Sequence, residues 1–155
     1  MNKAAFFCSL LFISLLSCSE SYIYEQSYEP EEEVWRYEQA IEFDFEIVDT
    51  SAYYTFFLDI DHSVDYPFQN LYTRIKTSYP NGAEKEDVLS LELSDQLGLW
   101  QGNCRKEYCK VRIPLQTEAI IKEAGNYSLR FEQFTRRDTL PGLKKLTLRV
   151  AKVAL

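Results

Sequence analysis

Apolar and acidic residues alternate strictly over residues 41–47, and similar alternation recurs along most of the chain. Successive side chains of a β-strand point to opposite faces of a sheet, so a period of two predicts strands with one buried face. Phe and Tyr, which favour strands, are abundant at 10 and 11 residues. The predicted strands cover residues 41–47, 54–60, 71–79, 89–93, 100–104, 109–115, 127–131 and 146–150.

The segments between these strands are short and contain residues that form turns. Pro80-Asn81-Gly82 is a turn signal, and a second turn is expected from Asp95 to Gly98. Residues 117–124 are predicted to form one short helix, which Gly125 would end. About eight strands without long intervening helices predict an all-β chain. The expected architecture is a single antiparallel β-sandwich, either Ig-like or jelly-roll-like.

The N-terminus has the pattern of a secretory signal that ends at a cysteine. Lys3 supplies a positive charge, residues 4–16 are apolar apart from two serines, and the small Ser17 precedes Cys18. The apolar run is too short for a membrane-spanning helix, which needs roughly 20 residues. Leu15-Leu16-Ser17-Cys18 resembles the bacterial lipobox. This resemblance implies that residues 1–17 are removed and that Cys18 is lipidated, and two or more acyl chains bind a membrane stably.

Charge divides the expected mature chain into two halves. From Ser19 to Asn70 there are fourteen acidic residues and one basic residue, whereas the rest of the chain has fifteen basic and ten acidic residues. An acidic N-terminal half is not suited to nucleic acid. The simple interpretation is an acidic tether that keeps the domain away from anionic headgroups. The alternative is that Arg136-Arg137 and Lys144-Lys145 contact an acidic partner.

Residues 19–34 show no hydrophobic period and include the acidic run Glu31-Glu32-Glu33. Such a composition favours a flexible segment. The predicted organisation is therefore a removed signal peptide (1–17), a lipidated cysteine with an acidic flexible tether (18–34), and a β-sandwich domain (35–155). Trp35 is expected to mark the beginning of the folded part.

Cys104 and Cys109 remain after the signal peptide is removed and Cys18 is lipidated. An even number of cysteines in an exported protein favours a disulfide, and the four residues between them fit a hairpin loop. Two free thiols are the alternative. A zinc site would need two further ligands, and His62 is the only histidine.

Signatures of catalysis are missing from the sequence. It contains no G-x-S-x-G elbow, P-loop, H-E-x-x-H motif or dinucleotide fingerprint. No catalytic residue, cofactor or metal is therefore predicted, and a hydrolase that uses paired carboxylates is a minor alternative. The cluster Asp59, Asp61, His62 and Asp65 could in principle hold Ca²⁺, but it lacks the EF-hand order. Turn-capping carboxylates and a solvent-facing histidine are the favoured interpretation.

Aromatic residues leave a second function open, that of a surface glycan-binding lipoprotein. Exposed rings can stack on sugars, although packing within sheets is the commoner role of tyrosine in a β-rich chain. Burial of Trp35 and Trp100 would argue against this function. The rings considered are Tyr22, Tyr24, Tyr28, Trp35, Tyr37 and Trp100.

Several motifs occur along the chain in the same order as in the GldH family of gliding-motility lipoproteins, which the sequence resembles. They begin with the lipobox, Trp35 and the segment Phe43 to Thr50. Asp65-Tyr66-Pro67-Phe68-Gln69-Asn70-Leu71 is the densest match. The later motifs are Tyr79-Pro80-Asn81-Gly82 with Asp87 and Leu89, Asp95-Gln96-Leu97-Gly98 with Gly102, Gly125-Asn126-Tyr127, Gln133 with Arg136, and Leu140-Pro141-Gly142-Leu143.

This resemblance implies a membrane-anchored, non-catalytic accessory of the gliding machinery and its associated protein-secretion system. Its partners would be a membrane lipid, through acylated Cys18, and other envelope proteins. Nucleic acid is not an expected partner. Cys104 and Cys109 depart from the family pattern. Ser19 follows Cys18 where some bacteria place Asp to retain a lipoprotein in the inner membrane, so the outer membrane is the expected location.

The segment Asp65 to Leu71 has two interpretations. Asp65, Pro67 and Asn70 are turn formers, and Tyr66 and Phe68 could fix that turn to the core. Alternatively, Asp65, Tyr66, Phe68 and Asn70 form an exposed docking loop for a partner.

Overall fold

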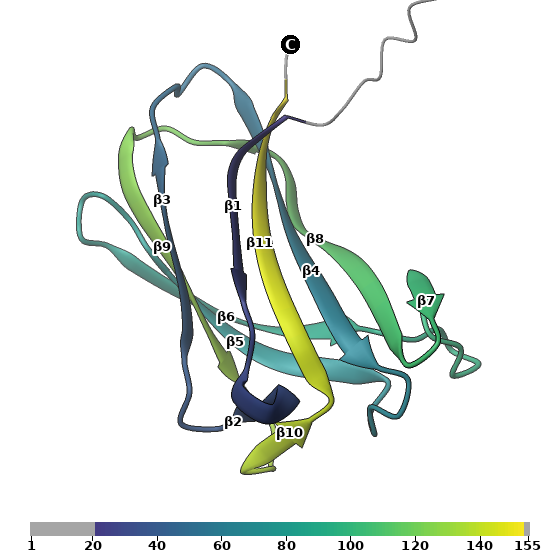
Figure 1. The fold of residues 1–155 in the computed structure, drawn as a ribbon. Helices are drawn as coiled ribbons and strands as arrows, with labels where there is room; N and C mark the ends of the chain where they lie inside the picture. Colours follow the sequence, from purple (N-terminus) through teal and green to yellow (C-terminus); the bar gives the residue numbers. More distant parts are fainter. Residues whose placement is uncertain (1–20, 154–155) are drawn as a thin grey trace, which may run out of the picture.

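Two antiparallel sheets face each other in the computed structural model, which describes residues 21–153 (Figure 1). The expected signal peptide and Cys18 lie outside the described residues. The five-stranded sheet has the order β1-β11-β4-β8-β7 and the four-stranded sheet the order β3-β9-β5-β6, while β2 and β10 form a small separate pair. No helix within residues 21–153 has the length and hydrophobicity needed to cross a bilayer.

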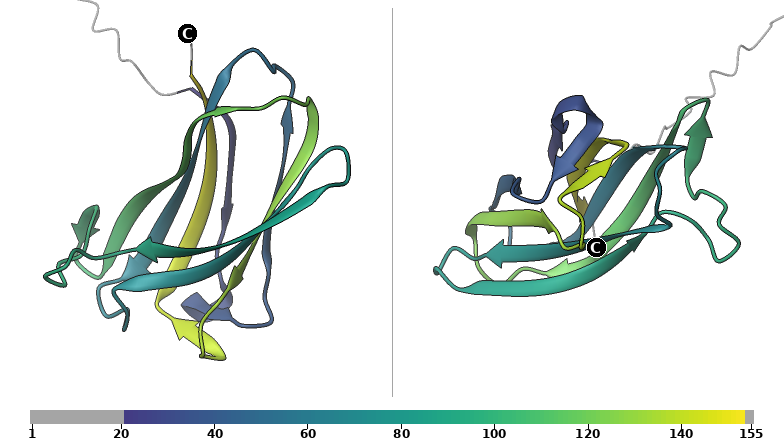
Figure 2. Two further views of the ribbon diagram at one scale, coloured as in Figure 1. Left: turned by 180° about the vertical axis from the view of Figure 1, so that it is seen from behind. Right: turned by 90° about the horizontal axis from the view of Figure 1, so that it is seen from below.

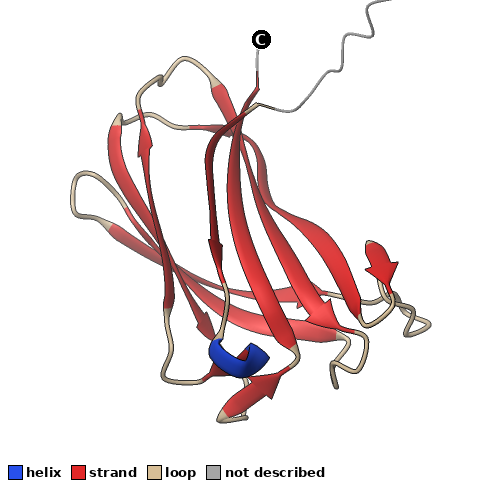
Figure 3. Ribbon diagram, in the orientation of Figure 1, coloured by secondary structure: helices blue, strands red, loops and turns tan. Residues whose placement is uncertain are grey.

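Strands account for nearly all of the regular structure (Figure 3), and the only helical element described is a 3-10 turn, η1. In Figure 2, β5 and β6 run obliquely across the strands of the five-stranded sheet. The elements are β1 (Tyr22–Tyr28), η1 (Glu31–Glu33), β2 (Val34–Arg36), β3 (Ile41–Ile47), β4 (Tyr53–Ser63), β5 (Asn70–Ser78), β6 (Glu84–Glu92), β7 (Asn103–Arg105), β8 (Tyr108–Ile120), β9 (Gly125–Gln133), β10 (Thr139–Pro141) and β11 (Leu143–Val153).

The all-β prediction is confirmed, with eleven described strands instead of about eight. β3 follows its predicted alternation at every position, since its apolar residues are buried and its acidic residues are exposed. The three strands that the sequence did not indicate are β1, β2 and β10. β2 and β10 have only three residues each, too few for a period of two to be visible.

Aromatic side chains join the two sheets. The ring of Phe45 on β3 lies 5.7 Å from that of Phe56 on β4 and is stacked against Tyr127 on β9 at 5.8 Å. Trp35 on β2 is completely buried, and its Nε1 donates a hydrogen bond to the carbonyl of Gln39 at 2.7 Å. Each fully buried side chain of this size contributes about 1.5–3 kcal/mol, so these rings stabilise the sandwich substantially.

The structure corrects the expectation of a flexible tether over its described residues. β1 pairs with β11, and Tyr24 and Tyr28 pack against the hydrophobic core. The ring of Tyr24 lies 5.6 Å from that of Phe45. The half-buried Tyr24 and Tyr28 supply the core-facing side of this strand in place of aliphatic residues, and for that reason the segment shows no aliphatic period.

The uneven charge distribution has an internal explanation. The N-terminal strand β1 lies beside the basic C-terminal strand β11. Glu25 in β1 forms an ion pair with Arg149, and Glu29, just after β1, pairs with Lys145 at 2.8 Å. Asp49 and Lys152 form a third pair at 2.7 Å. The two halves of opposite charge therefore meet along the five-stranded sheet, and part of their charge is used in ion pairs with each other.

The predicted helix at residues 117–124 is wrong. β8 continues to Ile120 and pairs with β4, with Ala119 opposite Tyr54 and Ile120 opposite Tyr53. An isolated helix of eight residues is marginal in water, whereas strand pairing satisfies the backbone and buries Ala119. Tertiary pairing therefore overrides the local preference of these residues for a helix.

Candidate binding surfaces

The predicted docking loop connects β4 to β5 and is held at several points. The ring of Tyr66 is buried, 5.7 Å from that of Phe68 and 5.9 Å from that of His62. The backbone N–H groups of Leu93 and Ser94 both donate to the carbonyl of Gln69, at 2.9 and 3.0 Å. These contacts fix the loop to the core from two sides.

The four predicted docking residues lie in different environments. Tyr66 is buried, Phe68 and Asn70 are half-buried, and Asp65 is exposed. Asn70 Nδ2 donates to Ser90 Oγ on β6 at 2.7 Å. Tyr66 and Asn70 thus make structural contacts. A docking role for the exposed side of the loop, around Asp65, stays a prediction.

His62 is buried and not solvent-facing as expected. Its ring packs edge-on against Trp100 with 4.6 Å between centroids, and Nδ1 lies 2.9 Å from the carbonyl oxygen of Ser63. Burial lowers the pKa of His62, so the imidazole is neutral at neutral pH. His62 continues the inward-facing series of β4 and acts as a packing residue.

The two tryptophans do not form a shared platform for sugars. Trp35 has no exposed surface, and Trp100 is half-buried with its Nε1 donating to the carbonyl of Val64 at 3.0 Å. Tyr37 is half exposed, but Tyr24 and Tyr28 pack against the core. The complete burial of Trp35 and the partial burial of Trp100 therefore favour a role in packing.

Asp59 lies at the centre of a charged cluster on the outer face of the five-stranded sheet. Its side chain is 1% exposed, and Oδ1 accepts a hydrogen bond from Arg112 Nε at 2.7 Å. Oδ2 accepts from Arg112 Nη2 at 3.1 Å and from Arg149 Nε at 3.0 Å. This cluster connects β4 with both of its neighbours, β8 and β11, so the expected turn-capping role does not apply to Asp59.

Desolvation opposes the ionisation of Asp59, but the hydrogen bonds and charges of its basic neighbours outweigh this effect. Among these basic neighbours Arg112 has the largest effect, followed by Lys110 and Arg149, and together they hold the pKa of Asp59 below its ordinary value. The carboxylate is thus committed to ion pairs and not to a cation site. In the described part of the chain, no three His, Cys, Asp or Glu residues are grouped so that they could bind a metal ion.

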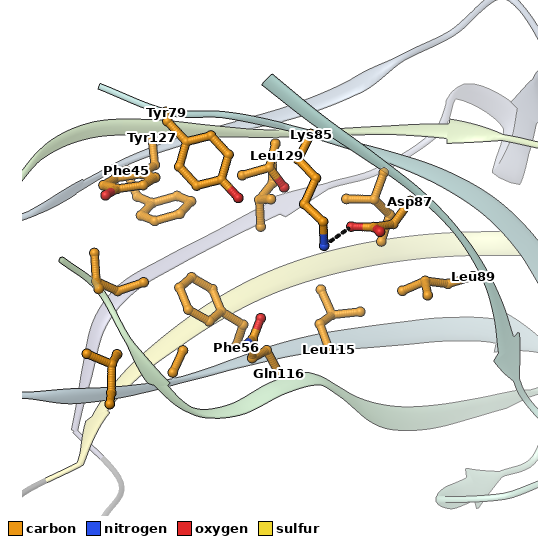
Figure 4. Close-up of a pocket in the computed structure, with 15 residues that line it drawn as sticks. Phe45, Phe56, Tyr79, Lys85, Asp87, Leu89, Leu115, Gln116, Tyr127 and Leu129 are labelled. Atoms are coloured by element: carbon orange, nitrogen blue, oxygen red, sulfur yellow. Dashed lines mark ion pairs between the residues drawn. The ribbon is translucent and has the colours of Figure 1, made fainter. Parts of the chain in front are cut away.

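An apolar groove opens between the sheets where β6 and β8 face each other, and we call it the edge groove (Figure 4). Its volume is about 460 Å³. Figure 4 shows side chains of the two sheets facing each other across the groove, with the Lys85–Asp87 ion pair, 2.9 Å long, at one side. The apolar and aromatic lining residues are Phe45, Phe56, Ile75, Tyr79, Leu89, Leu115, Ala119, Ile120, Ile121, Tyr127 and Leu129.

Sequence reasoning missed this groove. Leu89 and Leu115 follow the same alternation as core residues, and they are only half-buried because no strand among residues 21–153 closes the sandwich between β6 and β8. Ile120, which is 62% exposed, lies in the segment that was predicted as a helix. The position of a free sheet edge depends on the order of strands in the sheet, and the alternation of apolar residues along the sequence does not predict that order.

Cys104 and Cys109 form a disulfide between β7 and β8. The two residues are direct cross-strand partners, and Arg105 pairs with Tyr108. The loop is therefore a two-residue turn, shorter than the four residues expected. Lys106 adopts a positive φ of 52° in this turn.

Replacing both Cys104 and Cys109 by alanine is expected to lower the free energy of unfolding by roughly 2 kcal/mol or less, because the loop that the disulfide closes is short. Amide hydrogen exchange should accelerate in β7 and stay unchanged in β3. Denaturant titration of the variant beside reduced wild-type protein measures the effect. A loss of about 4 kcal/mol or more would show that the disulfide supports more than this hairpin.

The sequence of the chain is similar to that of a known protein family. The chain matches the family described as GldH lipoprotein over residues 22–150, from the start of β1 to within β11. The chain belongs to the GldH lipoprotein family. It is 24% identical over 135 residues to the gliding motility lipoprotein GldH of Flavobacterium johnsoniae, covering 86% of this chain and 83% of that protein. It is 23% identical over 131 residues to a gliding motility lipoprotein GldH homolog of Christiangramia forsetii, covering 84% and 80%.

Many of the residues that carry the GldH resemblance determine turns and loop closures. Gln133 is buried, and its Nε2 donates to the carbonyl of Arg137 at 3.1 Å. Gly82 has a φ of 82° in the turn between β5 and β6, a conformation that favours glycine. Other residues of the GldH motifs line the edge groove, among them Tyr79, Asp87 and Leu89. The motifs thus include both structural residues and residues of the open surface.

Proposed function

We propose that this GldH-family chain is a lipid-anchored component of the bacterial gliding-motility machinery and its associated secretion system. It acts through contacts with other envelope proteins and without catalysis. The observation that carries this proposal is the family match over residues 22–150, which includes both sheets of the sandwich. The matched relatives are named as gliding motility lipoproteins, and each is covered over at least 80% of its length.

The arrangement of the buried polar residues supports a contact role. Asp59 is engaged with Arg112 and Arg149, and His62 is enclosed by aromatic rings. These groups stabilise the sheets and do not converge on the edge groove. The groove itself is mostly apolar, a composition that suits association with another molecule better than acid–base chemistry.

Cys18 provides the attachment in this proposal. It lies outside the described residues, and the lipobox-like sequence before it supports lipidation. The outer membrane is the proposed location because Ser19 replaces the Asp that retains some lipoproteins in the inner membrane. The lipid fixes the domain at the membrane, and the sandwich supplies the contacting surfaces.

Crosslinking in living cells tests this role. A tagged full-length chain, crosslinked and purified for mass spectrometry, should enrich motility and secretion components relative to a control that joins residues 1–21 to an unrelated domain. The control shares the anchor and lacks the sandwich, so it removes proteins that are captured only because they share the membrane. Equal recovery with both chains would contradict the proposal, and specific enrichment of glycan-uptake proteins would favour the glycan-binding alternative.

A further inference from the structure

β6 is a free edge of the four-stranded sheet. It pairs with β5 on one side, and no strand among residues 21–153 pairs with its other side. Two backbone hydrogen bonds define which residues face that open side. The N–H of Tyr79 donates to the carbonyl of Ala83, and the N–H of Leu93 donates to the carbonyl of Gln69, both at 2.9 Å.

Hydrogen-bonded and non-hydrogen-bonded pairs alternate in an antiparallel ladder. Since the pairs 79–83 and 69–93 are hydrogen-bonded, the odd-numbered residues of β6 bond to β5. The even-numbered residues Glu84, Glu86, Val88, Ser90 and Glu92 therefore direct their N–H and C=O groups towards the open side. These five residues, at every second position, form a regular open edge of N–H and C=O groups that is long enough to pair with another strand.

The opposite edge of the groove is much less regular. β8 carries Pro114, which has no N–H, and its register with β4 shifts on either side of Phe56. Glu118 also adopts a positive φ of 50°. Proline and bulges are common protections of sheet edges against unwanted pairing. Of the two edges that border the groove, β6 is thus the one suited to pair with an added strand.

The interior of the edge groove suits one face of such a strand. Side chains of an extended peptide alternate between two faces, and those that point inward would lie between Leu89 on β6 and Leu115 on β8. Ile120 and Ile121 continue this apolar surface. Peptide recognition by strand addition combines main-chain hydrogen bonds with pockets for alternate side chains, and the edge groove offers both.

The outward face of β6 has a different character. Glu84, Glu86 and Glu92 are exposed on this face, and Glu84 and Glu86 form ion pairs with Lys76 and Arg74 on β5. A partner strand with basic or polar residues at the facing positions would fit this polar face. Two antiparallel β6 edges brought together around Val88 would place Glu84 of one copy opposite Glu92 of the other, and like charges at facing positions are destabilising. These charges disfavour a second copy of this chain as the occupant.

We propose that β6 is the docking edge for an extended segment of a partner protein, which adds an antiparallel strand to the four-stranded sheet. The segment has apolar side chains at alternate positions, which enter the edge groove, and basic or polar side chains between them. This inference deepens the proposed function, and it rests on that function in taking another protein as the partner.

A synthetic peptide of this pattern provides the probe. The nonapeptide Lys-Val-Lys-Ile-Thr-Val-Lys-Ile-Lys is added to the isotope-labelled full chain in a non-ionic detergent, and a peptide of equal composition with its apolar residues in one block is the control. The alternating peptide should shift the amide resonances of β6 and slow hydrogen exchange at residues 84, 86, 88 and 90. Binding outside β6, equal binding of both peptides, or no binding would overturn the proposal.

Three substitutions at two exposed residues, Val88 and Ile120, localise the interaction. Val88→Pro removes an N–H on the open side, where proline is tolerated at an edge, and should weaken peptide binding about tenfold or more. Val88→Thr keeps that N–H and should bind like the wild type. Ile120→Glu places a charge in the groove at an exposed position and should also weaken binding. Unchanged binding by folded Val88→Pro would overturn strand addition.

Palmitate added in place of the peptide tests the other class of occupant. Binding of palmitate in the groove, with no binding of the peptide, would overturn the proposal in favour of an acyl chain.

The peptide experiment measures a surface of the purified chain, whereas crosslinking in cells measures its association with the machinery. A failure of the docking edge can therefore be distinguished from a failure of the proposed function.

Discussion

Replacing Cys18 by alanine is expected to move the protein from the membrane fraction to the soluble fraction of disrupted cells. The predicted attachment is a lipid on the cysteine sulfur, and alanine has no sulfur to accept it. Each buried acyl CH₂ contributes about 0.8 kcal/mol to membrane binding, so the loss of a diacylglyceryl group removes most of the affinity. Fractionation after a high-salt wash, followed by immunoblotting, measures the change.

The Cys104→Ala, Cys109→Ala double variant is the matched control for this experiment. It also replaces cysteine by alanine, but at residues that form the disulfide, and it should stay in the membrane fraction. A Cys18→Ala protein that remained membrane-bound after the salt wash would contradict attachment through this cysteine.

Substitution of Asp59 by alanine should lower the free energy of unfolding by about 2–3 kcal/mol. Removing one partner of a buried ion pair typically costs about 3–5 kcal/mol, because the other charge is left without compensation. The expected loss here is smaller because Arg112 is 39% exposed and water can solvate it after the carboxylate is removed. Denaturant titration at neutral pH measures the difference from the wild type.

The contribution of Asp59 should depend on pH. Its pKa in the folded state is lowered, so its stabilisation is present above the unfolded-state pKa of about 3.9 and is lost as the pH falls through the folded-state value. The stability difference between the wild type and Asp59→Asn should therefore narrow below about pH 4. Asp49, whose pKa is lowered by hydrogen bonds from Lys152 and Ser51, is present in both proteins and cancels in the difference.

Asp65→Ala is the control for both measurements. Asp65 is exposed, and its substitution should change the free energy of unfolding by no more than about 0.5 kcal/mol. Equal losses for Asp59→Ala and Asp65→Ala, or a difference for Asp59→Asn that stays constant down to pH 2, would show that the charged cluster does not stabilise the fold as described.

Alternation was sufficient to predict the strands that have one face in the core. Ile41, Phe43, Phe45 and Ile47 are all buried, and the acidic residues between them are exposed. β4 has the same inward series, and His62 continues it. The expectation of an exposed histidine failed because it used the chemical character of the side chain and not its place in the alternation.

The errors arose where tertiary contacts outweigh local preference. β1 looked like part of a polar tether, but Glu25 within it and Glu29 just after it find basic partners on β11, at the other end of the sequence. Residues 117–120 have helical preferences but pair with β4. Both segments depend on strands that are distant in sequence, and a reading of the local pattern does not include those strands.

The candidate surfaces were predicted less well than the fold. The loop at Asp65 was identified from its turn residues and its resemblance to a family motif, whereas the edge groove was not anticipated. Leu89 and Leu115 have the same residue type and spacing as buried residues, and their exposure depends on the absence of a covering strand among the described residues. Sequence pattern thus indicates which face of a strand is apolar, while the topology determines whether that face is covered.

The pairing of β1 with β11 limits how far the domain can stand from a lipid on Cys18. Three residues lie between Cys18 and Tyr22, and even when fully extended this stretch spans at most about 14 Å. Tyr22 pairs with Ala151, which pairs with Thr55, so this end of β4 would lie near the headgroups. From Thr55 to Ser63 the strand rises roughly 26 Å, and it carries the Asp65 loop away from the bilayer. The Asp65 loop and the end of the edge groove at Ile120, which pairs with Tyr53, would then meet partners at different heights above the membrane.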